Sequence, residues 1–237
     1  MVEELRSLAN PMNVAGMAKF GIASTNTLGI SIPTLRAIAK RCGRDHKLAV
    51  ELWRSGVHEA RILAAMVDEP EKVTPAQMDR WANQFDSWDI VDGVCGLFVR
   101  TPYALQKIAE WSAHKKEYVK RAAFTMIAYL TYRDKTATDA DILRFLPVIR
   151  REAGDERNFV KKAVNWALRN IGKRNARCNA AAITCAEQIR ADGTRSGRWI
   201  AADALRELRS DAVQARLAAA RNDGSRRTRR DPSLRSG

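Results

Sequence analysis

Two stretches decide the fold, "KEYVKRAAFTMIAYL" at residues 116–130 and "DERNFVKKAVNWALRNIGK" at residues 155–173. The two resemble each other, because Tyr118–Ala123 reads YVKRAA and Phe159–Val164 reads FVKKAV, 41 positions later. In both stretches apolar residues recur every three or four positions, which is the spacing of a helix with one buried face. The pattern therefore predicts two equivalent amphipathic helices.

Further copies extend this repeat in both directions. WIAADA at Trp199–Ala204 follows the second copy by 40 residues, and the segment "VHEARILAAMV" at 57–67 is a similar copy earlier in the chain. Polar connectors at 68–77 and 133–141 carry Thr/Pro and Thr/Asp helix-start signals, whereas strand signals are nearly absent. A period near 40 built from helix pairs is typical of HEAT repeats. We expect an all-α, HEAT-like helical repeat solenoid with a concave face.

Length and composition fit one repeat domain followed by a short tail. The chain has 237 residues and is 46% hydrophobic, and we expect a single domain over 1–220. Residues 221–237 have no periodicity and are rich in Arg, Ser and Gly, so we expect this tail to be disordered.

The charge predicts a polyanionic partner. Lys and Arg number 41 against 27 Asp and Glu, a net charge of +14. The tail holds six Arg and two Asp, which leaves +10 for residues 1–220. Nucleic acid is the commoner partner for such a chain, although the charge can also serve only to solvate the surface. No apolar run is long enough to cross a bilayer, and the N-terminus is not of signal-peptide type, so we expect no membrane contact.

The cysteines and histidines indicate no metal centre. Four scattered cysteines without CxxC spacing and only three histidines suggest neither a disulfide framework nor a zinc site. We therefore expect a cytoplasmic protein without a cofactor.

Basic side chains recur in register with the repeats. Spaced one repeat apart, they would follow a phosphate backbone and give the concave face a positive charge, although a single lysine on a helix is more often only solvated. The residues that recur in this way are Lys115, Lys116, Lys120, Arg121, Lys161, Lys162, Arg169, Lys173, Arg174, Arg195 and Arg198.

The segment "FDSWDIVDGVCGLF" at 85–98 combines residues that helix packing alone does not require. Trp88 and Asp92 stand four apart and so share a helix face. A partly buried carboxylate here is either paired with an arginine of the next repeat or functional, and the residues leave both open. Gly93 and Gly96 each weaken a helix interior by about 1 kcal/mol relative to Ala. They would allow close approach of a ligand or another backbone.

The start of that helix has structural explanations. Asp86 or Ser87 can cap it, and Asp89 in its first turn suits the positive end of the helix dipole. Trp166 lies at the edge of the apolar stripe of its own helix, where it can either pack in the core or face a ligand.

The chain resembles the HEAT-like repeat DNA alkylation repair glycosylases of AlkD type. The resemblance covers roughly residues 15–210 and is carried by SWDIVD at 87–92, VKRAAFTMIAYL at 119–130 and VKKAVNWALRNIGK at 160–173. It implies a functional set made of Trp88, Trp166, Asp92 and Arg121.

The same resemblance implies contacts to the DNA backbone. Arg169 and Lys173 match positions that contact the backbone in relatives, and Lys120, Lys161 and Lys162 extend the basic surface. Phe20 stands where relatives tend to carry a tyrosine, so the ring is kept and the hydroxyl is lost.

The implied reaction is hydrolysis of the N-glycosidic bond of N3- or N7-alkylated purines in double-stranded DNA, by a monomer without cofactor. Such a base is already cationic and leaves without a strong general acid, so one carboxylate suffices. Two alternatives remain open: a non-catalytic HEAT-repeat DNA-binding protein, and a solenoid that binds acidic protein partners.

Overall fold

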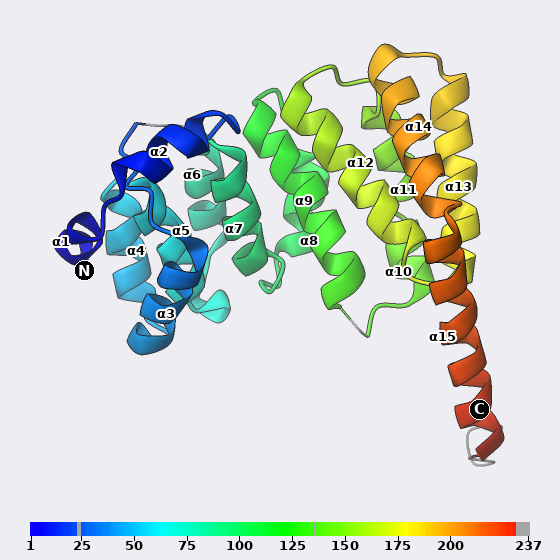
Figure 1. Cartoon of the computed structure of the whole chain (residues 1–237), viewed down its shortest axis with the longest axis horizontal. Coiled ribbons are helices and arrows are strands. Elements are labelled where there is room, and N and C mark those ends of the chain that lie inside the picture. The colour runs from blue at the N-terminus through cyan, green and yellow to red at the C-terminus, as the bar shows by residue number, and fades with distance from the viewer. Residues whose placement is uncertain (23–24, 135, 231–237) are drawn as a thin grey trace. The chain divides into compact units, whose positions relative to one another are not determined.

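A computed structural model describes residues 1–22, 25–134 and 136–230, with side chains as far as residue 220 (Figure 1). Every regular element in these residues is a helix, which confirms the all-α, HEAT-like repeat expectation. The elements are α1 (Val2–Ser7), α2 (Pro11–Ala18), α3 (Ile32–Cys42), α4 (His46–Arg54), α5 (His58–Val67), the 3₁₀ turn η1 (Pro70–Lys72), α6 (Pro75–Asn83), α7 (Trp88–Phe98), α8 (Ala104–Trp111), α9 (Glu117–Arg133), α10 (Asp139–Leu143), α11 (Leu146–Glu152), α12 (Asn158–Gly172), α13 (Ala176–Ala191), α14 (Arg195–Leu208) and α15 (Asp211–Arg230).

The repeat register proposed from the sequence is confirmed by burial. Val119, Val160 and Ile200, the equivalent apolar positions of the three copies, are at most 2% exposed. These residues lie in α9, α12 and α14. Identical placement of the same position in successive copies is what makes the chain a repeat protein.

Capping residues explain where the helices begin. Thr74 accepts a hydrogen bond from the backbone of Gln77, and Pro75 follows at the first position of α6. Thr138 and Asp141 form a reciprocal capping box at α10. Both starts were predicted from the polar connectors, because a side-chain oxygen at this position satisfies an otherwise unpaired backbone N–H.

The chain divides into two compact units, Met1–Met126 and Ile127–Gly237, where the sequence led us to expect one domain over 1–220. Repeat proteins are held together mainly by contacts between neighbouring repeats, so a long chain of them separates readily into groups. The second unit has α12, α13 and α14 packed side by side (Figure 1).

The expectation of disorder over residues 221–237 stays a prediction. Helix α15 continues to Arg230, while residues 231–237 lie outside the described part of the chain. From the start of α15 the sequence has no proline until Pro232, and its first ten residues include five alanines, the strongest helix former. Asn222, Asp223 and Gly224 are weaker helix formers.

A buried carboxylate fixes the N-terminal loop of the first unit. Glu59 on α5 is 1% exposed and accepts hydrogen bonds from the backbone N–H groups of Leu28 (2.8 Å), Gly29 (2.6 Å) and Ile30 (3.3 Å). Gly29 has φ +77°, and a Cβ there would lie 2.3 Å from the carbonyl oxygen of Asn10. The loop therefore needs both the carboxylate and the glycine.

The second unit contains a close contact at the end of α12. A Cβ on Gly172 would meet the Leu208 side chain at 2.6 Å and the Ala182 Cβ at 3.0 Å. Glycine at this position allows α12 to approach α13 and α14 closely.

Candidate active site

Asp92 is held in place by the following repeat. Its carboxylate receives Nη2 of Arg121 at 2.9 Å to each oxygen and Nε at 3.2 Å, so the pairing is bidentate. The hydroxyl of Thr125 lies 3.3 Å from Oδ1. The side chains of Arg121 and Asp92 are 7% and 21% exposed. The carboxylate is thus fixed by a buried cation and keeps one edge accessible.

Trp88 lies beside this ion pair, as the four-residue spacing predicted. The guanidinium of Arg121 is 5.9 Å from the centre of a Trp88 ring, and the indole is half-buried. Its Nε1 donates to the backbone carbonyl of Phe20 at 3.0 Å. The Phe20 side chain itself is 74% exposed. The first unit therefore brings together an indole, a carboxylate and a guanidinium, and the backbone of Phe20 lies beside the indole.

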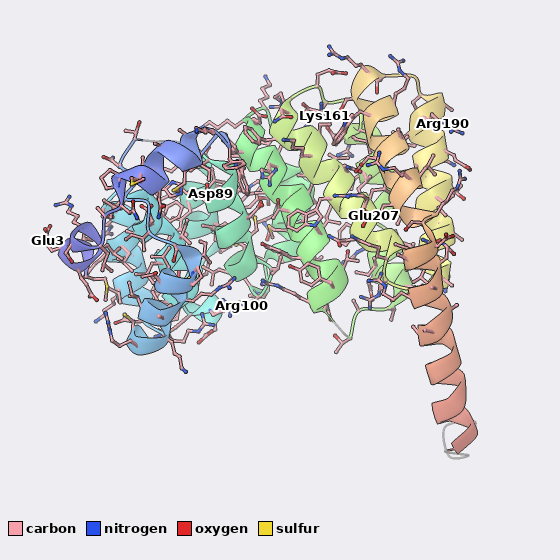
Figure 2. All side chains as sticks on the ribbon, in the orientation of Figure 1. Glu3, Asp89, Arg100, Lys161, Arg190 and Glu207 are labelled. Atoms are coloured by element: carbon pink, nitrogen blue, oxygen red, sulfur yellow. The ribbon has the colours of Figure 1, made fainter. Side chains whose placement is uncertain are left out.

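The start of α7 differs in detail from the expected capping. Ser87 occupies the N-cap position, but its hydroxyl donates to the carboxylate of Asp89 and does not cap the helix. Asp89, marked in Figure 2, also bonds His58 Nε2 at 2.7 Å. Asp86 pairs with Arg61 at 3.2 Å and is half exposed. Both acids that precede Asp92 therefore have structural partners.

The two acids of α7 differ in their pKa. Burial raises the pKa of the Asp92 carboxyl above its ordinary value, and the charge and hydrogen bonds of Arg121 and Thr125 offset this only in part. Burial also acts to raise the pKa of Asp89, but the hydrogen bond and charge of His58 and the Ser87 hydroxyl outweigh it and lower that pKa. An aspartate with a raised pKa in a partly open site is a candidate for chemistry.

Gly93 leaves space beside Asp92. It is exposed, and a Cβ there would meet only Ile62 Cγ2 within 4 Å, at 3.7 Å. The fold therefore has room for a side chain at this position. Neither packing nor a positive φ requires the glycine, which leaves close approach of a ligand as a hypothesis.

Trp166 belongs to the second unit and lies off the core stripe of α12. It is half-buried, whereas Ala163 and Ala167 beside it are fully buried. Tyr129 packs edge-on against it, with ring centres 5.4 Å apart and planes at 81°. The guanidinium of Arg133 lies 4.4 Å from the centre of the Tyr129 ring. The sequence analysis missed Tyr129, although its position in the repeated stretch was visible.

The predicted basic residues have different surroundings. Lys162 is exposed, but Lys120 is only 7% exposed and offers little surface to a ligand. Arg169 Nη1 pairs with Glu207 at 2.7 Å, and Lys173 pairs with the other oxygen of the same carboxylate at 2.8 Å. An acidic residue of α14 therefore already partners two of the cations expected to contact DNA.

These pairs belong to a ladder between α12 and α14. Residues four apart on α12 each meet the residue 38 positions later on α14, namely Lys161 with Trp199, Asn165 with Asp203 and Arg169 with Glu207. Figure 2 shows Lys161 near the start of α12 and Glu207 toward the end of α14. A constant offset of this kind follows from two helices that run in the same direction in register.

Among the described residues, no group of three or more His, Cys, Asp or Glu is placed to hold a metal ion. Within the same ranges, no helix is both long enough and apolar enough to span a bilayer.

The fold and this site define a helical-repeat protein with a tryptophan–aspartate–arginine cluster. The model of the DNA alkylation repair enzyme family matches residues 1–208, and the chain belongs to that family.

Two further similarities were found. The uncharacterized protein Lin0241 of Listeria innocua serovar 6a is 27% identical over 122 residues, which are 49% of this chain. The match spans only about half, 54%, of that relative. The fold is similar, with a TM-score of 0.70, to a solved structure from a new family of proteins related to the HEAT-like repeat DNA glycosylases with affinity for branched DNA structures. That match has 19% identity and covers 78% of this chain and 80% of the other, so it bears on the fold alone.

Proposed function

We propose that the protein is a DNA glycosylase that hydrolyses the N-glycosidic bond of N3- or N7-alkylated purines in duplex DNA. The observation that carries the proposal is the partly exposed Asp92, fixed by Arg121 beside Trp88, in a member of the DNA alkylation repair family. The carboxylate supplies the negative charge that this reaction needs, and the indole supplies a ring face for a cationic base.

The chemistry requires one well-placed carboxylate. An alkylated purine carries a positive charge, so the bond between C1′ and the ring nitrogen breaks with its electron pair going to the base, which leaves neutral. The sugar develops oxocarbenium character, which an adjacent carboxylate stabilises. Asp92 would also orient the water that attacks C1′ and accept its proton.

The aromatic residues would bind the cationic nucleotide. Ring-face contacts with a cation contribute about 0.5–2 kcal/mol each. The guanidinium of Arg121 already lies 5.9 Å from the centre of a Trp88 ring, so this ring suits a positive group. We assign the same role to Trp166, whose edge contact with Tyr129 orients the indole.

The assay measures free base released from duplex DNA that contains 7-methylguanine. We expect release by the wild type and a loss of at least about 100-fold in Asp92→Asn, the lower end of what a positioned acid–base group contributes. Asp86→Asn is the matched control. It removes the charge of a half-exposed acid that lies just before α7 and pairs with Arg61, so this variant should still release the base. Equal release by Asp92→Asn and wild type would remove Asp92 from the mechanism.

Backbone phosphates would have to compete with Glu207 for Arg169 and Lys173. If these two cations contact phosphate, Glu207→Gln should tighten binding to undamaged duplex DNA and make its salt dependence steeper, because each neutralised phosphate adds about 0.9 to the slope. Glu187→Gln removes an exposed carboxylate that pairs with Arg209 outside the ladder, and it should change neither quantity. An unchanged slope in Glu207→Gln would exclude these two residues from the phosphate contacts.

A non-catalytic DNA-binding protein is the second candidate. It is favoured by the bidentate Arg121 contact, which engages both oxygens of Asp92. The similar solved structure also comes from a family that is described as related to HEAT-like repeat DNA glycosylases and as having affinity for branched DNA, with no activity named. DNA binding by the wild type without any base release would support this candidate and reject the glycosylase.

A further inference from the structure

Trp199 is exposed at a place where the fold does not require an aromatic residue. Its side chain is 42% exposed, whereas Trp53, Trp81 and Trp111 are at most 4% exposed. The buried stripe of α14 is made by other residues, including Ile200, which follows Trp199 directly and is fully buried. Trp199 is therefore outside the apolar face that holds α14 in the unit.

The surroundings of Trp199 are basic. Nζ of Lys161 lies 4.9 Å from the centre of the indole ring, and Arg195 and Arg198 on the first turns of α14 are exposed. Two acids lie near the ring. The carboxylate of Glu156 accepts the backbone N–H of Ser196 at 2.9 Å, and Asp203, one turn after Trp199, pairs with Arg169 and Arg206. Three cations against these two carboxylates, one of which pairs with arginines of its own, leave a net positive charge around the ring.

Lys161 differs from the other cations of the α12–α14 ladder. Arg169 and Lys173 meet the carboxylate of Glu207, whereas the partner of Lys161 on α14 is the indole of Trp199. Its charge is consequently not offset by the α14 residue that it contacts. The ladder thus ends in a cation and an exposed aromatic ring.

We propose that Trp199 and Lys161 form a second DNA contact, in which the indole stacks on an unpaired base and the Lys161 ammonium group attracts the adjoining phosphate. An exposed indole surrounded by cations suits single-stranded nucleic acid, because every base has a ring face and every nucleotide a negative charge. A paired base in a duplex does not offer that face. The inference depends on the part of the proposed function that concerns DNA binding. It does not depend on base release.

The test uses two fluorescein-labelled DNA probes with equal numbers of phosphates, a blunt duplex and a duplex with a single-stranded overhang, and measures Kd by anisotropy. We expect the wild type to bind the overhang probe more tightly. Trp199→Ala should weaken overhang binding at least about fivefold, the lower end for loss of one stacked base, with a smaller effect on the blunt probe. Trp199→Phe should keep most of the preference, since it keeps a ring.

Leu105→Ala is the control for removing an exposed apolar side chain, since Leu105 is 46% exposed on α8 and should not affect the preference. Circular dichroism checks that each variant is folded. Overhang binding by Trp199→Ala within twofold of wild type would overturn the proposal, and so would equal losses on both probes or a wild type without preference.

Base release by the wild type separates this inference from the proposed function. If the wild type releases no 7-methylguanine but Trp199→Ala still loses overhang binding, the glycosylase proposal fails and the stacking contact stands. If release is normal and Trp199→Ala binds both probes like the wild type, the glycosylase proposal stands and the stacking contact fails.

Discussion

Replacing Asp92 with asparagine distinguishes a catalytic carboxylate from a structural one through stability as well as activity. A carboxyl whose pKa is raised on folding holds its proton more tightly in the native state than in the unfolded state. That group favours the native state most below the unfolded pKa of about 4, and the advantage is lost as pH rises through the raised folded pKa. Asparagine resembles the neutral carboxyl at every pH, so Asp92→Asn should not lose stability at pH 7.

The magnitude follows from the contacts of Asp92. Asparagine keeps one oxygen that accepts from Arg121 and gives up the bond to the second oxygen, a loss of about 1.5–3 kcal/mol for a charge-assisted hydrogen bond. Relief from burying the carboxylate charge acts in the opposite direction and is the larger effect on the pKa. We expect the free energy of unfolding of Asp92→Asn to lie within about 1 kcal/mol of wild type, or above it.

Urea denaturation at several pH values provides the measurement. The difference between Asp92→Asn and wild type should shift in favour of the variant as pH rises from about 4 to 7. A structural ion pair would instead predict a loss of about 3–5 kcal/mol at pH 7. That outcome would refute the reasoning and return Asp92 to a structural role. Arg121→Ala is the reciprocal control, since it leaves Asp92 without its cation and should be the more destabilising of the two substitutions.

Four other substitutions test the fold and the site. Gly172→Ala should lower the free energy of unfolding by about 1–3 kcal/mol through overpacking. Gly16→Ala on α2 should raise it by about 0.5–1 kcal/mol, because nothing lies within 4 Å of the added Cβ. Urea denaturation midpoints measure both changes. Glu59→Gln should cost about 2 kcal/mol by the same measurement, because an amide replaces one of the two accepting oxygens with a donor that faces a backbone N–H. An unchanged midpoint would contradict that role. Trp166→Ala should slow single-turnover base release about 2- to 30-fold without loss of folding, and an unchanged rate would place Trp166 outside the site.

The helices were predictable because their signal is local and repeated. The apolar stripe of one copy recurs at equivalent positions in the next, so the spacing around Val119 and Val160 is enough to identify two buried faces. The spacing of Trp88 and Asp92 likewise places both on one face of α7, and both lie beside Arg121.

Pairing between repeats was not predictable in the same way. Which carboxylate meets Arg169 or Lys173 depends on the register of α12 against α14, and a shift of one residue would turn Glu207 away from both. The serine at the start of α7 shows the same limit on a smaller scale. Ser87 has the right type for a cap, but nearby Asp89 offers its hydroxyl a charged acceptor, which makes a stronger hydrogen bond than a cap.

The ion pair at Asp92 also sets a condition on the proposed substrate. A cationic base that approaches Asp92 must approach Arg121 as well, and two unit charges about 6 Å apart repel by about 3 kcal/mol at an effective dielectric constant of about 20. A backbone phosphate near the lesion would remove this repulsion by pairing with the Arg121 guanidinium. Asp92 would then have an oxygen free to stabilise the sugar and orient the water. On this mechanism, a free alkylated nucleoside without flanking phosphates should be a much poorer substrate than the same base within DNA. Comparable rates on the two substrates would show that Arg121 does not have to leave Asp92 before the bond breaks.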